Sequence, residues 1–197
     1  GSVFCWSLRT RRTIWTLPAH PGSSVLMIDT LSSSKDTLVT QGRDGYVCIW
    51  RMSTDGAAPQ KTDTLPCAHL GFCAATILEY SSQEAIAMPT GNQSEVSVTN
   101  LATKIIISKL KPVSGDPKAH GMVMVVKAVM RETQNLLLTG YEDGYVALWN
   151  IMTATEYGSH KFHPESIMTL DYCSSINIGT VASVDTEVKF FSIESIE

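Results

Sequence analysis

The chain has 197 residues, of which 44% are hydrophobic and 17% charged, an ordinary composition for a folded soluble domain. Its 19 acidic and 15 basic residues give a formal charge of −4, the wrong sign for a domain that binds duplex nucleic acid through a clustered positive surplus. No apolar run is long enough to cross a bilayer. We therefore expect neither a nucleic-acid nor a membrane partner.

From the first residue on, the sequence predicts short β-strands rich in Val, Ile, Leu and Tyr, separated by polar turns, with no segment of helical period. Asp-Gly steps at Asp44-Gly45 and Asp143-Gly144 suit tight turns, because glycine accepts positive φ and Asp bonds its own backbone. The expected strands are 1–8, 11–17, 25–31, 37–42, 46–50, 62–66, 95–101, 104–110, 123–130, 136–140, 145–149, 155–162 and 187–193.

Two of these stretches are near copies of each other. TQGRDGYVCIWRM spans residues 40–52 and TGYEDGYVALWNI spans residues 139–151, and both place Asp-Gly-Tyr-Val and an apolar pair before a Trp. Aligned on that Trp, the chain gives five anchor positions: Trp6, Trp50, Thr99, Trp149 and Phe191. Their spacings of 44, 49, 50 and 42 residues match the period of a four-stranded propeller blade.

Histidines provide a check on the phase of this repeat. His20, His69, His120 and His163 precede their anchors by 30, 30, 29 and 28 residues, and only His160 falls outside the series. Catalytic or metal-binding histidines have no reason to recur at the period of a blade. The spacing therefore favours a structural repeat over a single chemical site.

Four polar or amphipathic residues recur together in the two best repeats: His20, Thr40, Asp44 and Trp50 in one, and His120, Thr139, Asp143 and Trp149 in the other. A His, an Asp and a hydroxyl resemble a catalytic triad, but a triad is needed only once. We interpret each set as a buried hydrogen-bond network in which Asp accepts from His, His bonds the hydroxyl and the Trp N–H completes the chain.

The other repeats are less regular. Before Thr99 the Asp position holds Gln93 and the hydroxyl position holds Pro89, so only His69 remains. Before Phe191, His163 and Asp185 remain, but the hydroxyl position holds Val181. These blades are expected to depend more on apolar packing.

The five cysteines form no CxxC pair and none of the spacings of a zinc site: Cys5, Cys48, Cys67, Cys73 and Cys173. Their apolar neighbours and odd number predict reduced, mostly buried thiols in a cytoplasmic and/or nuclear protein. No catalytic residue, cofactor, metal or small-molecule substrate is expected, because no nucleophile, base or ligand set stands outside the repeat.

The chain opens without Met or a signal peptide, so we expect a piece of a longer protein.

The period and phase resemble those of WD-repeat β-propellers, although the Gly-His and Trp-Asp pairs of that family are degenerate here. The resemblance implies an all-β class and a single partial propeller over residues 1–197, with about four and a half blades of an expected seven. Several segments resemble more closely the guanine nucleotide-binding protein beta-subunit-like protein 1 family, also called ASTRA-associated protein 1. They are SLRTRRTIWTL (7–17), TQGRDG (40–45), LGFCAATIL (70–78), KLKP (109–112), LLLTGYEDGYVALWNI (136–151) and KFHPESIMTLDY (161–172).

This closer resemblance implies a non-enzymatic scaffold or adaptor whose partners are proteins. The family is associated with the ASTRA assembly and with the co-chaperones that mature phosphatidylinositol-3-kinase-related kinases, so these co-chaperones or the large kinases are the expected partners. Guanine nucleotide binding is not expected, since the chain has no GxxxxGK[ST] loop. Two alternatives remain open: a substrate receptor of a ubiquitin ligase and a Gβ-like signalling subunit.

Propellers commonly bind partners on the face where the turn before the Asp-Gly step opens. The residues just ahead of that Asp are Arg43 in one repeat and Tyr141 and Glu142 in the other. An exposed Arg or Tyr is a suitable anchor for a partner. We therefore predict that these three residues are exposed and contact a partner protein.

Overall fold

The structure is a computed structural model that describes residues 1–68, 71–112, 120–131 and 134–196. The described residues form seventeen β-strands and one short 3-10 helix, η1 (Ile193–Ser195). The predicted all-β class is confirmed. None of the helical segments described reaches the length and apolarity of a membrane span.

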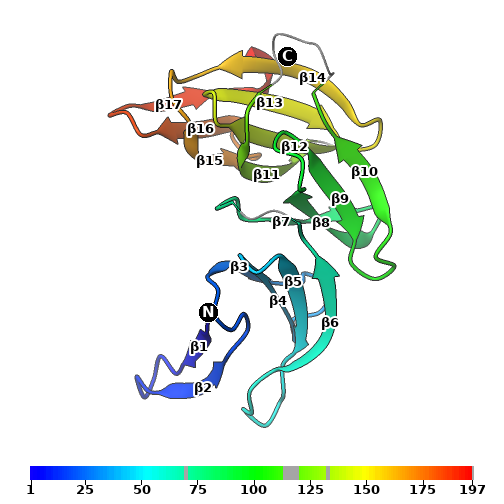
Figure 1. The fold of residues 1–197 in the computed structure, drawn as a ribbon, viewed down its shortest axis with the longest axis vertical. Helices are drawn as coiled ribbons and strands as arrows, with labels where there is room; N and C mark the ends of the chain where they lie inside the picture. The colour runs from blue at the N-terminus through cyan, green and yellow to red at the C-terminus, as the bar shows by residue number, and fades with distance from the viewer. Residues whose placement is uncertain (69–70, 113–119, 132–133, 197) are drawn as a thin grey trace. The chain divides into compact units, whose positions relative to one another are not determined.

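The chain divides into two compact units, Gly1–Phe72 and Cys73–Glu197. Each unit is described by itself below, and a single domain over residues 1–197 stays a prediction. The first unit contains a two-stranded antiparallel sheet followed by a four-stranded one in the order β3-β4-β5-β6 (Figure 1). Its strands are β1 (Val3–Trp6), β2 (Thr13–Leu17), β3 (Val25–Thr30), β4 (Thr37–Gly42), β5 (Tyr46–Arg51) and β6 (Gln60–Pro66).

The second unit contains three antiparallel sheets, ordered β10-β9-β8-β7, β11-β12-β13-β14 and β15-β16-β17. In each, strands adjacent in sequence pair with each other, as in the blade of a propeller. The strands are β7 (Thr76–Tyr80), β8 (Gln83–Pro89), β9 (Val96–Asn100), β10 (Ile106–Leu110), β11 (Val123–Arg131), β12 (Gln134–Tyr141), β13 (Tyr145–Asn150), β14 (Thr155–Lys161), β15 (Ile167–Cys173), β16 (Ile178–Ser183) and β17 (Val188–Phe191).

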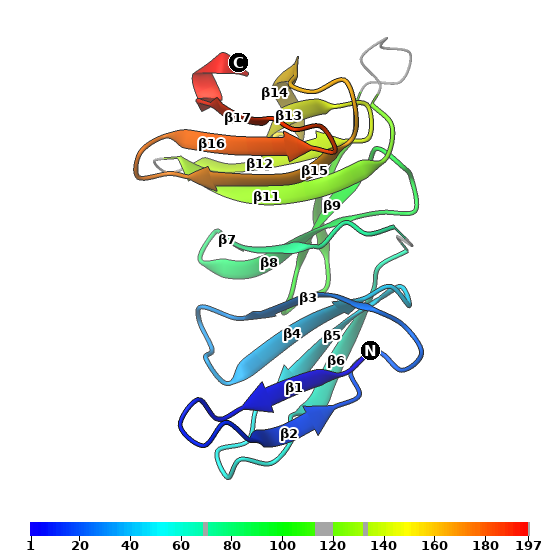
Figure 2. The ribbon, with the colours of Figure 1, turned by 90° about the vertical axis from the view of Figure 1, so that its left-hand side faces the viewer.

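Successive side chains of strand β12 pack into two different cores of the second unit. Leu136 and Leu138 pack with Ile167, Leu170 and their neighbours on the β15–β17 side. Leu137 and Tyr141 pack with residues of the β7–β10 sheet such as Val98. Because neighbouring strand residues point to opposite faces, a strand buried on both faces reads as a continuous apolar run. Figure 2 shows these three sheets lying one beside the next within the unit.

A register shift recurs at the same place in two sheets. It falls between Ile49 and Trp50 where β5 pairs with β6, and between Leu148 and Trp149 where β13 pairs with β14. Such β-bulges increase the local twist and change the direction of the following side chain. Both anchor Trp residues therefore enter the core immediately after a bulge.

Candidate functional site

The residues singled out by the repeat lie around the turn that joins the second and third strands of a four-stranded sheet. In the first unit this turn connects β4 to β5 and contains Asp44 and Gly45, and Gly45 has φ +86°. The Asp44 carboxylate accepts the backbone N–H of Tyr46 at 3.3 Å, which closes the turn. Asp143, Gly144 and Tyr145 repeat this arrangement between β12 and β13, with a distance of 3.2 Å.

In the β3–β6 sheet all three predicted links of the network are present. His20 Nδ1 lies 3.0 Å from the Asp44 carboxylate oxygens, and His20 Nε2 lies 2.9 Å from Thr40 Oγ1. The indole N–H of Trp50 donates to the same Thr40 oxygen at 2.9 Å. A carboxylate only accepts, so Nδ1 carries the proton, and Nε2 accepts from the Thr40 hydroxyl. Every polar side-chain atom of this four-residue network has a partner.

This geometry does not expose a nucleophile. The Thr40 side chain is wholly buried and its hydroxyl already bonds two neighbours, Trp50 and His20. His20 is also wholly buried, while Asp44 keeps 27% of its side chain exposed. A substrate has no access to the hydroxyl, and the arrangement favours the structural interpretation over a catalytic triad.

In the β11–β14 sheet the same four residues form two separate pairs. His120 Nδ1 lies 2.8 Å from Asp143, and the Trp149 indole N–H donates to Thr139 Oγ1 at 2.9 Å. However, His120 Nε2 is buried and has no partner among the described residues. The predicted bond from His120 to the Thr139 hydroxyl is therefore wrong for this sheet.

The two sheets differ in this bond because of the residue two positions after the threonine. It is Gly42 after Thr40 and Tyr141 after Thr139. A Cβ at Gly42 would lie 2.2 Å from His20 Nδ1, so the ring of His20 rests directly against the backbone there. At the matching position the Tyr141 ring is wholly buried and lies beside the ring of His120, with centroids 4.6 Å apart. In the β3–β6 sheet the small Gly42 leaves room for His20 to reach Thr40. In the β11–β14 sheet the side chain of Tyr141 fills the equivalent space, and His120 does not reach Thr139.

Tyr141 is consequently not an exposed partner contact, and that prediction is wrong. It is the last residue of β12, a strand buried on both faces, and it packs in the same core as Leu137. Burial raises the pKa of its phenol well above the ordinary value. Its hydroxyl has no hydrogen-bond partner in the described part of the chain.

The β15–β17 sheet retains half of the network, as predicted. His163 Nδ1 lies 2.6 Å from Asp185, and His163 Nε2 lies 3.4 Å from the backbone carbonyl of Val181. The hydrogen bond from His163 is the main cause that holds the pKa of Asp185 below its ordinary value. In the β7–β10 sheet His69 lies outside the described residues, and the buried Thr99 hydroxyl at the anchor has no partner among the described residues.

Arg43 is exposed, as predicted, at the start of the β4–β5 turn. Its backbone N–H donates to the Ser24 carbonyl at 2.9 Å, which fixes the turn to the loop before β3. Its guanidinium carbon lies 4.1 Å from the centre of the Phe72 ring, and Phe72 is itself 71% exposed. A cation stacked on an exposed aromatic ring is a suitable recognition element for a partner. Phe72 was not predicted, because its sequence neighbours carry no repeat signal.

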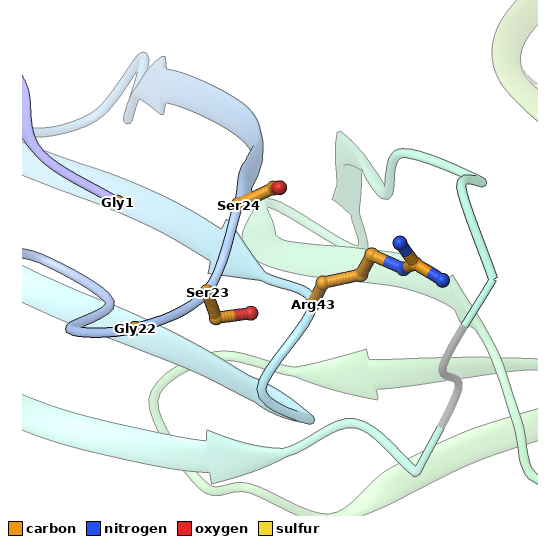
Figure 3. A pocket seen from close by; sticks show the side chains of 5 residues that line it. All are labelled: Gly1, Gly22, Ser23, Ser24 and Arg43. Atoms are coloured by element: carbon orange, nitrogen blue, oxygen red, sulfur yellow. The ribbon is translucent and has the colours of Figure 1, made fainter.

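An open hollow of about 520 Å³ adjoins this arginine. The described residues that line it are Gly1, Gly22, Ser23, Ser24 and Arg43, and none of these side chains is a carboxylate. Figure 3 shows the Arg43 side chain extending from its turn, with the hydroxyls of Ser23 and Ser24 on the neighbouring segment. This part of the first unit combines one cation, two hydroxyls and one exposed ring.

Glu142 occupies the position of Arg43 in the other repeat and is also exposed. Its carboxylate accepts the backbone N–H of Met122 at 3.1 Å, and its carbonyl accepts the Ser166 hydroxyl at 2.8 Å. These contacts stabilise the loops around the turn. The two equivalent turns therefore present opposite charges, a cation at Arg43 and an anion at Glu142.

Within the described ranges, no group of three or more His, Cys, Asp or Glu side chains is placed to hold a metal ion. Three cysteines, Cys48, Cys67 and Cys73, are buried thiols outside any disulfide, whereas Cys173 is exposed. The Cys48 and Cys73 side chains belong to the apolar cores of their units.

A scan against family models matches residues 11–51 to the WD domain, G-beta repeat. The matched stretch runs from β2 to the end of β5 and includes the complete network of His20, Thr40, Asp44 and Trp50. The chain therefore contains a WD repeat. The likeness to a solved propeller confirms the predicted fold class: this WD-repeat chain superposes on the Myceliophthora thermophila Cps50 (Swd1) β-propeller domain with a TM-score of 0.75 at 19% identity. The match covers 98% of this chain and 59% of that one.

Two curated relatives bear the names anticipated from the sequence. The WD-repeat chain is 30% identical to mouse guanine nucleotide-binding protein subunit beta-like protein 1 over 195 residues, 98% of this chain and 59% of the relative. It is 25% identical to ASTRA-associated protein 1 of Scheffersomyces stipitis over 167 residues, 77% of this chain and 38% of the relative. The WD-repeat chain thus spans less than two thirds of the length of these relatives.

Proposed function

We propose that this WD-repeat chain belongs to a non-enzymatic scaffold that assembles protein complexes, in particular ASTRA-type or co-chaperone complexes that mature phosphatidylinositol-3-kinase-related kinases. The likeness to a relative named ASTRA-associated protein 1 supports the assembly. The polar residues that resemble a triad are buried in hydrogen-bond networks, which supports a structural rather than a catalytic use. We also propose a location in the cytoplasm and/or the nucleus.

The exposed Arg43–Phe72 pair is the observation that carries this proposal. An arginine and an aromatic ring are the side chains that most often dominate the energy of protein interfaces. The turn that presents Arg43 is fixed by Asp44 and by Ser24, so little conformational entropy is lost when a partner binds. A charge reversal at Arg43 leaves the buried network intact.

The test is affinity capture of the full-length protein from cell extract, with mass spectrometry of the bound proteins. Wild type is compared with Arg43→Glu and with Lys35→Glu, a charge reversal at another exposed position of the same unit. We expect wild type and Lys35→Glu to recover kinase co-chaperones or the large kinases. We expect Arg43→Glu to lose them, with unchanged thermal unfolding.

Capture of other proteins would favour one of the two alternative functions. Ubiquitin-ligase subunits would indicate a substrate receptor, and Gγ subunits would indicate a Gβ-like signalling subunit. Either result would contradict the proposed assembly. Equal recovery by wild type and Arg43→Glu would instead place the contact on another face of the protein.

A further inference from the structure

A second exposed surface of the first unit has a different composition from the Arg43 turn. The hairpin that connects β1 to β2, residues 7–12, contains Arg9, Arg11 and Arg12, all of them exposed. The first acidic residue of the whole chain is Asp29. A chain with a formal charge of −4 therefore carries a concentrated positive charge in one six-residue segment, called here the basic hairpin.

The backbone of the basic hairpin is ordered by hydrogen bonds of Ser7. The Ser7 N–H donates to the Arg12 carbonyl at 2.9 Å, and the Ser7 carbonyl accepts from the N–H of Arg11 at 2.8 Å. The Ser7 hydroxyl accepts the N–H of Thr10 at 3.1 Å. Arg11 has φ +54°, a conformation that this bonded turn maintains. The backbone that carries the three arginines is thus held in a fixed turn.

The part of the chain that the structure describes gives these guanidinium groups no ion pair or hydrogen bond, in contrast to Arg51, which lies 2.8 Å from Asp36. Three like charges within four residues repel each other, so an anion that bound all three would relieve the repulsion. Two large apolar residues precede them directly in the sequence, Leu8 with 95% of its surface exposed and Trp6 with 58%. An isolated exposed Leu needs no explanation, but in the sequence Leu8 stands between an exposed Trp and the arginines.

The number of positive charges on the basic hairpin favours a short acidic peptide over an extended polyanion as its ligand. Duplex nucleic acid is usually held by about six to ten phosphate contacts, and three arginines are too few. The attraction of three arginines to an anionic membrane is too weak for stable anchoring. Because the chain as a whole is acidic, an extended duplex or an anionic membrane would also be repelled by its other residues. A short segment fits within the reach of the hairpin and avoids that repulsion.

We propose that the basic hairpin docks a short acidic segment of a partner protein. The carboxylates of that segment pair with Arg9, Arg11 and Arg12, and an apolar side chain of it packs on Leu8 and Trp6. Arginine is suited to this role because its planar group binds a carboxylate through two parallel hydrogen bonds. This surface is additional to the Arg43 turn and does not depend on it.

The test uses purified full-length protein and the fluorescein-labelled peptide Glu-Glu-Phe-Glu-Glu, with binding followed by fluorescence anisotropy at low salt. The double variant Arg9→Gln/Arg12→Gln is compared with Lys35→Gln/Lys111→Gln, which removes the same charge at two other exposed positions. Loss of two exposed ion pairs corresponds to about tenfold weaker binding. We expect that loss in the arginine variant and less than a twofold change in the lysine variant.

Two further comparisons test the parts of the surface separately. Leu8→Ser should weaken binding of the Phe peptide more than binding of Glu-Glu-Ser-Glu-Glu, because only the former offers an apolar side chain. Arg43→Glu should retain full affinity, which separates this surface from the proposed scaffold contact. In wild type, bound peptide should protect Arg9 and Arg12 from phenylglyoxal, a readout by mass spectrometry that needs no variant.

Several results would overturn the proposal. They are no measurable binding of the acidic peptide by wild type, an equal loss in the arginine and lysine variants, and unprotected arginines in the phenylglyoxal experiment. Stronger hairpin-dependent binding to phosphatidylserine vesicles or to single-stranded RNA than to the peptide would show that the partner class is wrong. Loss of binding in Arg43→Glu with full binding in the arginine variant would assign the acidic segment to the hollow beside Arg43.

Discussion

The Tyr141 ring lies against the His120 ring, with centroids 4.6 Å apart, and His120 Nε2 is left without a partner among the described residues. In the equivalent repeat Gly42 leaves room for His20, whose Nε2 lies 2.9 Å from Thr40 Oγ1. One residue therefore decides whether the four network residues form one continuous chain or two separate pairs. This difference leads to predictions that compare the two repeats directly.

The two threonines should differ in their contribution to stability. Thr40→Val leaves two buried groups without a partner, the indole N–H of Trp50 and Nε2 of His20. Thr139→Val leaves only the indole N–H of Trp149, because the histidine bond is already absent. With about 1–3 kcal/mol for each unsatisfied buried group, Thr40→Val should cost about 1–3 kcal/mol more. Urea unfolding followed by Trp fluorescence measures both, and equal costs would contradict the difference between the networks.

A methyl group at Gly42 should displace the His20 ring. The added Cβ would lie 2.2 Å from His20 Nδ1 and 2.5 Å from Asp44 Oδ1, so both bonds of the imidazole are disturbed. We expect Gly42→Ala to lower the free energy of unfolding by about 1–3 kcal/mol. The control is a double-mutant cycle with His20→Ala. If the collision with the ring is the cause, Gly42→Ala should cost much less once that ring is gone.

Removal of the Tyr141 hydroxyl should be neutral or slightly stabilising. That hydroxyl is buried without a partner among the described residues, so Tyr141→Phe removes a desolvated group and retains the ring beside His120. The matched variant is Tyr172→Phe, which removes a hydroxyl that donates to Asn177, and it should cost about 1 kcal/mol. Chemical denaturation of both variants checks the order. Because Tyr141 is buried, Tyr141→Phe should also leave partner capture unchanged.

The His163–Asp185 pair predicts a dependence of stability on pH. The folded-state pKa of Asp185 lies below its ordinary value of 3.8, so the ionised carboxylate stabilises the fold above that value. The contribution is lost as the pH falls through the lowered pKa. Asp185→Asn should therefore be less stable than wild type at pH 7, and the difference should shrink below about pH 4. Urea midpoints across this range measure it.

The sequence predicts most of the strands because the local signals agree with the tertiary structure. Asp44-Gly45 and Asp143-Gly144 mark turns, and alternating or continuous apolar runs such as 136–138 mark strands buried on one or both faces. The His–Asp pairs are also predictable, because a spacing that recurs at the blade period places His120 beside Asp143 and His163 beside Asp185. These features depend on residues that recur at fixed positions within one repeat.

Features that depend on side-chain volume or on distant contacts were not predicted. Tyr141 was assigned to the exposed turn from its place before Asp143, but it is the last residue of β12, in which residues 136–141 are all buried. The prediction of a hydrogen bond between His120 and Thr139 was wrong for the same reason, because it did not account for the buried Tyr141 ring. The stacking of Arg43 on Phe72 joins two segments 29 positions apart, and no periodicity in the sequence connects them.

The separation of the β11–β14 network into two pairs shows that the four residues are divisible into a His–Asp half and a Thr–Trp half. The β15–β17 sheet retains only the first half, with Val181 and Phe191 in place of the second. The Thr–Trp half can therefore be exchanged for apolar packing while the His–Asp half still holds its turn. A blade can lose the Trp by which its repeat is recognised in the sequence and keep the shape of the turn that the His–Asp pair stabilises.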